Sequence, residues 1–324
     1  MKQFLKIAAV ALTGLAPLTV AGTAQAIDYP TKPITWIAPS SAGGGFDIVS
    51  RILSPKLSEV LGQPVVVQNI EGAGATIGAA VAASAAPDGY TILLANANHT
   101  AAESLYKSLS YHLLDAFDPI VRFTELQQVF IANPNFEAKT MEELVALAKE
   151  KPGEINMAHA GVGSPTFMCS KLLQAEAGIE ISDIPYAGGG QALTAVVSGE
   201  SDVECALYSA AKPFMEDGTV RGLAITSKER ASFAPDLPAV SETVPGYEFL
   251  GWFGLVVPKG TPLEVREKIR SALVETLADE KVKNALAELG MLPIDQGPEE
   301  FGAYLKNEVE QTKALIEKAG IEPQ

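Results

Sequence analysis

A glycine-rich segment at residues 40–47, reading Ser-Ser-Ala-Gly-Gly-Gly-Phe-Asp, constrains the fold more than any other part of the sequence. An apolar run at 34–38 precedes it and a stretch of helical periodicity at 48–61 follows it. Consecutive glycines adopt positive φ without steric cost, so several backbone N–H groups can point into one concavity that suits an anion. The N-terminus of the following helix would add unpaired N–H groups and a positive dipole end. The alternative is a flexible turn between a strand and a helix.

A second segment with the same layout favours the anion-binding interpretation. Residues 186–190, Tyr-Ala-Gly-Gly-Gly, follow a short apolar run at 181–185 and open a helical stretch at 191–198. Two such N–H concavities, far apart in the sequence, predict two lobes that grip one anionic ligand. Neither concavity contains Arg or Lys, so we expect backbone dipoles and hydroxyl groups to hold the anion.

The order of predicted elements indicates an α/β fold. Short apolar runs alternate with helical stretches along the chain, which is typical of mostly parallel sheets with helices on both faces. Proline at position 55 lies inside the first helical stretch and predicts a kink or a split there. The predicted strands lie at 29–39, 65–67, 91–95, 155–158, 203–207, 223–226 and 252–257. The predicted helices lie at 48–61, 76–86, 144–149, 191–198 and in stretches opened by residues 161–166, 261–264 and 298–300.

The N-terminal residues have the pattern of a secretory signal peptide. Lys2 and Lys6 precede an apolar run at 7–20, and Ala24-Gln25-Ala26 resembles a signal peptidase site. No later run is apolar over about 18 residues, so we expect a soluble mature chain that begins near Ile27. Loss of the two lysines takes the net charge from −15 to −17, which disfavours nucleic acid as a partner.

An ordered set of motifs resembles the Bug family, the TctC-like extracytoplasmic solute-binding proteins of tripartite tricarboxylate transporters. The matching segments cover the mature chain and read Tyr-Pro-Thr-Lys-Pro-Ile at 29–34, Ala-Gly-Gly-Gly-Phe-Asp at 42–47, Leu-Gly-Gln-Pro-Val-Val-Val at 61–67, Ala-Pro-Asp-Gly-Tyr-Thr at 86–91, Val256, Pro258, Gly260-Thr261-Pro262, and Pro-Glu-Glu-Phe at 298–301.

The resemblance implies a two-lobed periplasmic binding protein of the Venus-flytrap type, which is not an enzyme. The implied lobes are residues 27–124 with 252–324, and residues 125–251, with crossings near 121–128 and 249–253. The expected partners are a carboxylated solute and membrane permease subunits, and the protein is expected to be a monomer without a cofactor or metal.

The residues expected to contact the ligand lie in the two glycine-rich segments and in three further loops. They are Ser40, Ser41, Gly43, Gly44, Gly45, Phe46, Asp47, Asn96, Asn98, Gly163, Ser164, Thr166, Phe167, Ala187, Gly188, Gly189, Gly190 and Tyr208. Family members often carry a small hydroxyl residue or proline where this chain has Phe46. They also often carry an Asp-Asn pair after the strand that corresponds to Val203, where this chain reads Glu204-Cys205-Ala206-Leu207-Tyr208. Phe46 and Phe167 predict a ligand with an apolar or aromatic body.

Other functional interpretations have less support. Gly72 to Gly78 resembles a dinucleotide fingerprint, but its third glycine is one residue late, so close helix packing is favoured. A secreted hydrolase would need Ser40, Ser41 or Ser164 as its nucleophile, and no general base with a recognisable partner is present. A solute sensor for a membrane kinase would share the fold. Cys169 and Cys205 could form a disulfide or remain buried thiols.

Overall fold

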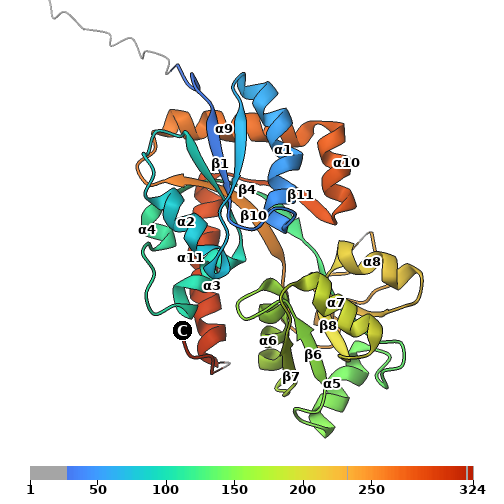
Figure 1. Cartoon of the computed structure of the whole chain (residues 1–324). Coiled ribbons are helices and arrows are strands. Elements are labelled where there is room, and N and C mark those ends of the chain that lie inside the picture. Colours follow the sequence, from blue (N-terminus) through green and yellow to red (C-terminus); the bar gives the residue numbers. More distant parts are fainter. Residues whose placement is uncertain (1–27, 232, 319, 324) are drawn as a thin grey trace, which may run out of the picture.

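The computed structural model describes residues 28–231, 233–318 and 320–323, which form two α/β lobes (Figure 1). Lobe 1 is built on a six-stranded sheet of order β11-β4-β10-β3-β1-β2, and lobe 2 on a five-stranded sheet of order β7-β6-β8-β5-β9. The predicted signal peptide lies outside the described residues. No helix in the described part is both long enough and apolar enough to span a membrane.

Strands and helices alternate through most of both lobes. The strands are β1 (Ile34–Ala38), β2 (Val65–Asn69), β3 (Thr91–Ala95), β4 (Phe117–Leu126), β5 (Gln128–Ala132), β6 (Asn156–His159), β7 (Ser182–Pro185), β8 (Val203–Leu207), β9 (Arg221–Ile225), β10 (Gly251–Pro258) and β11 (Met291–Gln296). The helices are α1 (Gly45–Leu61), α2 (Thr76–Ala83), α3 (Ala97–Leu105), α4 (Leu113–Ala116), α5 (Met141–Glu150), α6 (Pro165–Ala177), α7 (Gly189–Ser198), α8 (Tyr208–Glu216), α9 (Leu263–Ala278), α10 (Glu280–Glu288) and α11 (Pro298–Lys318), with 3₁₀ turns η1 (Ala73–Ala75) and η2 (Val240–Glu242).

Both sheets are mixed, because the chain crosses between the lobes within its strands. In lobe 1, β1 pairs in parallel with β2 and β3, whereas β10 is antiparallel to β3 and β4. In lobe 2, β6 is parallel to β7 and β8, whereas β5 is antiparallel to β8 and β9. A strand that enters a lobe from its neighbour starts at the edge where the other strands end. The crossing strands β5 and β10 are therefore antiparallel to the strands of the βα units that the sequence predicts.

Residues next to Gln127 connect the two sheets. β4 ends at Leu126 and β5 begins at Gln128, while the return path enters β10 at Gly251. The Thr226 hydroxyl donates to the Gln128 carbonyl (3.0 Å) and the Tyr208 N–H donates to the Gln127 carbonyl (2.9 Å). These bonds hold the outgoing and returning segments together at the hinge.

Helices cover both faces of each sheet. In lobe 1, α1, α9 and α10 enclose one core, and α2, α3 and α11 cover the other face. In lobe 2, α5 and α6 cover one face, and α7 and α8 the other. Cys169 of α6 and Cys205 of β8 form a disulfide, which decides between the two alternatives that the sequence leaves open.

Two local predictions meet different outcomes. The prediction of a split at Pro55 is wrong, since α1 runs unbroken from Gly45 to Leu61. Pro55 is exposed, so water can solvate the carbonyl that loses its partner, while the buried Leu53 and Leu57 hold both halves of the helix on the core. The prediction of close helix packing is confirmed at Gly78 of α2. A Cβ there would lie 2.8 Å from the Ile70 carbonyl oxygen.

Candidate functional site

The sheet directions bring all the predicted site loops to the facing ends of the two lobes (Figure 1). β1 and β3 run in the direction of β4, which leaves lobe 1 at Leu126, so their carboxyl ends point toward lobe 2. β6, β7 and β8 run against β5, which enters lobe 2 at Gln128, so their carboxyl ends point toward lobe 1. The loop after each of these strands therefore borders the space between the lobes, where ligands of α/β sheets bind.

The lobe 1 loop is held in shape by its own aspartate. The N–H of Gly43, whose φ is +81°, donates to Asp47 Oδ2 (2.8 Å), and Arg51 Nε donates to Asp47 Oδ1 (2.8 Å). Arg51 Nη2 also donates to Asn69 Oδ1 (3.1 Å), and Asn69 Nδ2 donates to the carbonyl of Ser40 (3.1 Å). This chain of contacts fixes both ends of the loop to the end of β2.

These contacts assign Asp47 to the loop structure. The residue is 4% exposed, and the N–H of Gly43, followed by Asn69 and Arg51, holds the pKa of its carboxyl below the ordinary aspartate value. One N–H group of the predicted concavity, that of Gly43, therefore already donates to the charged carboxylate of Asp47. Sequence reasoning missed the contribution of Arg51 and Asn69, although the four-residue spacing of Asp47 and Arg51 on one helix could have suggested the first.

The first turn of α1 supplies the unpaired donors of lobe 1. The helix begins at Gly45, three residues before its predicted start, and its N-cap Gly44 provides no side-chain cap. The N–H groups of Gly45 and Phe46 have no hydrogen-bond partner among the described residues. A Cβ at Gly44 would lie 2.8 Å from Ser40 Oγ, so the loop has no room for a side chain there.

The lobe 2 glycine loop is more open. Gly188 is the N-cap of α7, without a side-chain cap, and Gly189 and Gly190 form the first turn. No bond from their three N–H groups appears within the described chain, and a Cβ at any of the three would meet no atom within 4 Å. Gln191 Oε1 accepts from the N–H of Ala187 (3.3 Å), and the N–H of Tyr186 donates to the His159 carbonyl (2.9 Å), so the contacts that hold this loop lie at its ends.

The loop between β6 and α6 uses its hydroxyl groups internally. Ser164 Oγ donates to the Gly161 carbonyl (2.6 Å), and Thr166 Oγ1 accepts from the N–H of Ala160 (2.8 Å). The loop also touches lobe 1, because a Cβ at Gly163 would lie 2.6 Å from Leu105 Cδ1. The two lobes are therefore in contact at this edge.

Both predicted phenylalanines are buried. Phe46 is 7% exposed and packs edge-on against Phe253, with ring centroids 5.4 Å apart. Phe167 is 4% exposed, stacks on His159, and joins an apolar cluster that includes Leu105 of lobe 1. Their rings pack inside the protein behind the loops instead of standing in open space.

The remaining predicted residues lie at helix starts. Asn96 caps α3 by accepting from the N–H of Asn98 (2.9 Å), and no hydrogen bond of the Asn98 side chain appears in the described part. His99, next to them, is fully buried, and burial lowers its pKa to about 4, so it is neutral. Tyr208 begins α8 and stacks on Phe233 at 4.7 Å.

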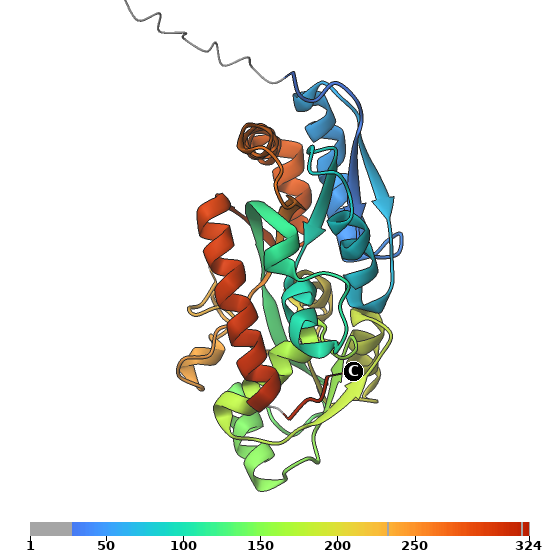
Figure 2. The same cartoon turned by 90° about the vertical axis from the view of Figure 1, so that its left-hand side faces the viewer.

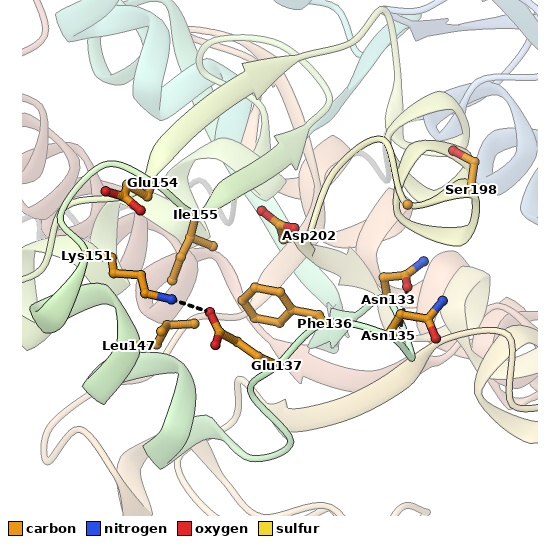
Figure 3. Close-up of a pocket in the computed structure, with 11 residues that line it drawn as sticks. Asn133, Asn135, Phe136, Glu137, Leu147, Lys151, Glu154, Ile155, Ser198 and Asp202 are labelled. Carbon is orange, nitrogen blue, oxygen red and sulfur yellow. Dashed lines mark hydrogen bonds and ion pairs between the residues drawn. The ribbon is translucent and has the colours of Figure 1, made fainter.

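Two pockets of the described structure differ in their distance from these loops: the first lies far from them, and the second includes Ala97 and Met168, which are sequence neighbours of predicted site residues. One, of about 550 Å³, is at the far end of lobe 2 (Figure 3). Phe136 and Asp202 line it beside the ion pair of Glu137 and Lys151. The other, of about 660 Å³, lies between the lobes along α11. Neither pocket is lined by a residue predicted to contact the ligand.

Residues 49–321 match the model of the tripartite tricarboxylate transporter family receptor. The chain belongs to this family. A relative from Agrobacterium vitis, described as the UPF0065 protein in the TAR-I ttuE-ttuC' intergenic region, is 35% identical over 92% of this chain and 87% of its own length. The resemblance to the Bug and TctC-like proteins is thereby confirmed.

Solved structures of family proteins share the fold. The periplasmic binding protein BugD is 35% identical, with a TM-score of 0.79 over 91% of this chain and 100% of its own. The Rhodopseudomonas palustris proteins Rpa4515, solved with adipate, and MatC, solved with malate, are 27% and 30% identical. Their TM-scores are 0.81 and 0.78, over 92% and 89% of this chain and 100% of each.

By its family and its related structures, this receptor is a two-lobed periplasmic solute-binding protein and not an enzyme. The hydrolase alternative is therefore wrong. Two of the serines considered as nucleophiles bond to backbone in their own loops: Ser164 Oγ donates to the Gly161 carbonyl, and Ser40 Oγ donates to the carbonyl of Ser41. No group of three or more metal-ligating side chains gathers in the described residues.

Proposed function

We propose that this receptor captures a carboxylate-bearing organic solute between its lobes and delivers it to the permease subunits of a tripartite tricarboxylate-type transporter. The capturing lobes are residues 27–124 with 252–324, and residues 125–251. The receptor acts as a monomer in the periplasm after its signal peptide is removed near Ala26.

One observation carries this proposal: two helices with uncapped N-termini face the space between the lobes. Gly45 and Phe46 on one side, and Gly188 to Gly190 on the other, offer N–H groups without partners in the described chain. Each hydrogen bond to a carboxylate contributes about 1.5–3 kcal/mol. Three or four of them support a micromolar Kd, about −8 kcal/mol, after the cost of ordering is subtracted.

The body of the solute is proposed to be apolar or aromatic. The buried rings of Phe46 and Phe167 back the loops with apolar surface, and two aliphatic side chains in the same segments are accessible: Ile48 is 39% and Val162 51% exposed. Adipate, found with the Rhodopseudomonas palustris protein Rpa4515, is a carboxylate with an apolar body. Malate, found with MatC, is a hydroxylated acid and represents the competing class.

A thermal-shift panel tests the ligand class. We expect aromatic and alkyl mono- and dicarboxylates to raise the Tm more than citrate, malate or acidic amino acids. If citrate or an amino acid gives the largest shift in Tm, the proposal that the solute has an apolar or aromatic body is overturned. If none of the carboxylates shifts the Tm, the proposed function itself is overturned. Phe46→Thr should change the ranking if the ring behind the loop sets the preference.

Small-angle scattering tests capture between the lobes. Contacts divided between the lobes form together only when the lobes close, so saturating ligand should reduce the radius of gyration. An unchanged radius with saturating ligand would contradict closure. Co-purification with the permease subunits, strengthened by ligand, would support delivery, whereas capture of a membrane kinase instead would favour the sensor alternative.

A further inference from the structure

The pocket along α11 is a second space between the lobes, on the face of the lobe 1 sheet opposite α1. Figure 2 shows α11 running along this side of the molecule beside α3. Lobe 1 contributes α3, β4 and α11 to its wall, and lobe 2 contributes α6 and the segment 246–250. Its volume of about 660 Å³ is sufficient for a small organic molecule.

Much of the wall of this pocket is apolar. Its aliphatic and aromatic wall residues come from both lobes and are Ala97, Ala101, Met168, Leu172, Phe249, Leu250, Ala314 and Leu315. Such a wall stabilises an alkyl chain by about 25 cal/mol for each Å² of apolar surface removed from water.

The charged groups of the pocket leave two carboxylates unpaired. Arg122 pairs with Glu125 at 2.9 Å, and Lys318 pairs with Glu176 across the lobes at 3.5 Å. The other two wall carboxylates, Glu308 of α11 and Glu248 of the returning segment, form no ion pair in the described structure. The pocket therefore has a net charge of −2 when every carboxylate is ionised.

Glu308 is also poorly satisfied by hydrogen bonds. Its Oε2 is shielded from water and has no partner of good hydrogen-bond geometry among the described residues, and the same is true of Trp252 Nε1, which lies close enough to stabilise the ionised carboxyl. Its Oε1 accepts one long bond, from Thr100 Oγ1 at 3.5 Å. Burial raises the pKa of Glu308 to about 7, against opposing effects of Trp252, Tyr304, Arg122 and Thr100. A buried carboxyl in this state is stabilised by an added cation.

We propose that this pocket binds an aliphatic diammonium compound, with one ammonium group at Glu308, the other at Glu248, and the alkyl chain along the apolar wall. Tyr304 lines the Glu308 end, and the Arg122 guanidinium already lies over its ring at 3.9 Å, so the attraction for the ammonium group comes from the Glu308 carboxylate. Because Glu308 belongs to lobe 1 and Glu248 to the segment that returns from lobe 2, the bound diamine connects the lobes. Its binding is thereby coupled to the carboxylate cleft, and the coupling is reciprocal.

Calorimetry with 1,5-diaminopentane tests the two-carboxylate arrangement at constant ionic strength. We expect the diamine to bind about threefold more tightly than pentylamine, since the second ammonium group pairs with an exposed carboxylate, and Glu308→Gln to weaken diamine binding at least about tenfold. Glu248→Gln should have a smaller effect, because Glu248 is exposed. Glu310→Gln, on an exposed position of the same helix outside the pocket, is the matched control and should bind as the wild type does. Equal affinity for diamine and monoamine, or wild-type affinity in Glu308→Gln, would overturn the proposal.

A second variant tests the location without changing a charge. Ala314 is an exposed wall residue, so Ala314→Trp should fill the pocket without disturbing a core. We expect this variant to lose diamine binding while keeping the wild-type Tm without ligand. Wild-type diamine affinity in Ala314→Trp would place the diamine elsewhere and overturn the proposal. Gly189→Val should keep diamine binding even where it loses carboxylate binding, which separates this proposal from the proposed function.

The proton balance gives an independent readout. An ammonium group favours the ionised form of Glu308, so binding should release a proton near pH 7 and tighten from pH 6 to pH 8. The groups that face Glu308 are Thr100, Arg122, Trp252 and Tyr304, and burial raises the pKa of the Tyr304 phenol, so this group stays neutral between pH 6 and pH 8. The same pH dependence in Glu308→Gln would assign the proton to another group and contradict the proposed contact.

Discussion

The two glycine-rich loops share a sequence pattern but differ in how they are supported. In lobe 1, Asp47 accepts from the N–H of Gly43 and from Arg51, and Asn69 holds the Ser40 carbonyl. In lobe 2, the loop is held by neutral contacts alone among the described residues: Gln191 accepts from the N–H of Ala187 (3.3 Å), Thr194 donates to the Gly190 carbonyl (2.8 Å), and no charged side chain contacts the glycines. The lobe 1 loop is therefore preformed, whereas the lobe 2 loop has open space around its backbone and can adjust to the ligand.

One buried carboxyl group in each lobe, Asp47 in lobe 1 and Glu204 in lobe 2, differs in the same way in how many hydrogen-bond donors surround it. Asp47 has charged and N–H donors around it, and its pKa is lowered. Glu204 of β8 is 1% exposed, its Oε2 has no hydrogen-bond partner in the part of the chain that the structure describes, and burial raises its pKa to about 8. Burial of a carboxyl stabilises the protein when donors surround it and destabilises the ionised form when they are absent.

The largest effect is expected from a side chain on the lobe 2 loop. Gly189→Val places a branched side chain where nothing lies within 4 Å, so the fold is kept while ligand approach to the N–H groups is blocked. Loss of two charge-assisted bonds, about 3 kcal/mol or more, lowers affinity at least about 100-fold. Calorimetry gives the affinity and thermal unfolding the Tm.

Gly44→Val in lobe 1 should also lose binding, but with a lower Tm, because its Cβ would lie 2.8 Å from Ser40 Oγ. Equal Tm values for the two variants would contradict the contrast between a preformed and an open loop, and unchanged affinity in both would contradict the role of either loop.

The second effect is expected in the pH dependence of the free energy of unfolding. As the pH rises above 4.5, the unfolded chain loses the Glu204 proton, while the folded protein keeps it until about pH 8. The contribution of Glu204 to the free energy of unfolding therefore falls between these values, by about 1.4 kcal/mol per pH unit, and is constant above pH 8. Glu204→Gln should remove this slope, so the difference in unfolding free energy between variant and wild type grows toward pH 8. A difference independent of pH, measured by urea unfolding, would contradict the assignment.

A smaller effect is expected from the brace in lobe 1. Asp47→Asn keeps the shape of the side chain but removes the charge that Gly43 and Arg51 contact. The loss of charge-assisted bonds, about 1.5–3 kcal/mol, should lower both the Tm and the carboxylate affinity. Arg51→Ala is the matched variant and should show the same direction of change. Wild-type affinity in Asp47→Asn would show that the loop forms without its brace.

The smallest effect is expected from the brace in lobe 2. Gln191→Ala removes one neutral, exposed hydrogen bond, which contributes about 0.5–1.5 kcal/mol at most. We expect less than a roughly tenfold change in carboxylate affinity and no measurable change in Tm. An effect larger than that of Asp47→Asn would reverse the comparison between the two loops.

The sequence by itself determined the elements whose signals are local. Glycine runs between apolar and helical stretches predicted both loops, and their helices begin within those runs, at Gly45 and Gly189. The βα alternation predicted the α/β class, because apolar periodicity and turn residues act over a few neighbouring positions. The ordered motifs indicated the receptor family.

Only the tertiary structure decided features that depend on distant contacts. The crossing strands β5 and β10 run antiparallel to their neighbours because they enter from the other lobe, and no local signal encodes this direction. Phe46 and Phe167 appear available for a ligand in the sequence, yet residues far along the chain bury them. The disulfide of Cys169 and Cys205 depends on how α6 packs on β8, since pairing requires two side chains to meet in space.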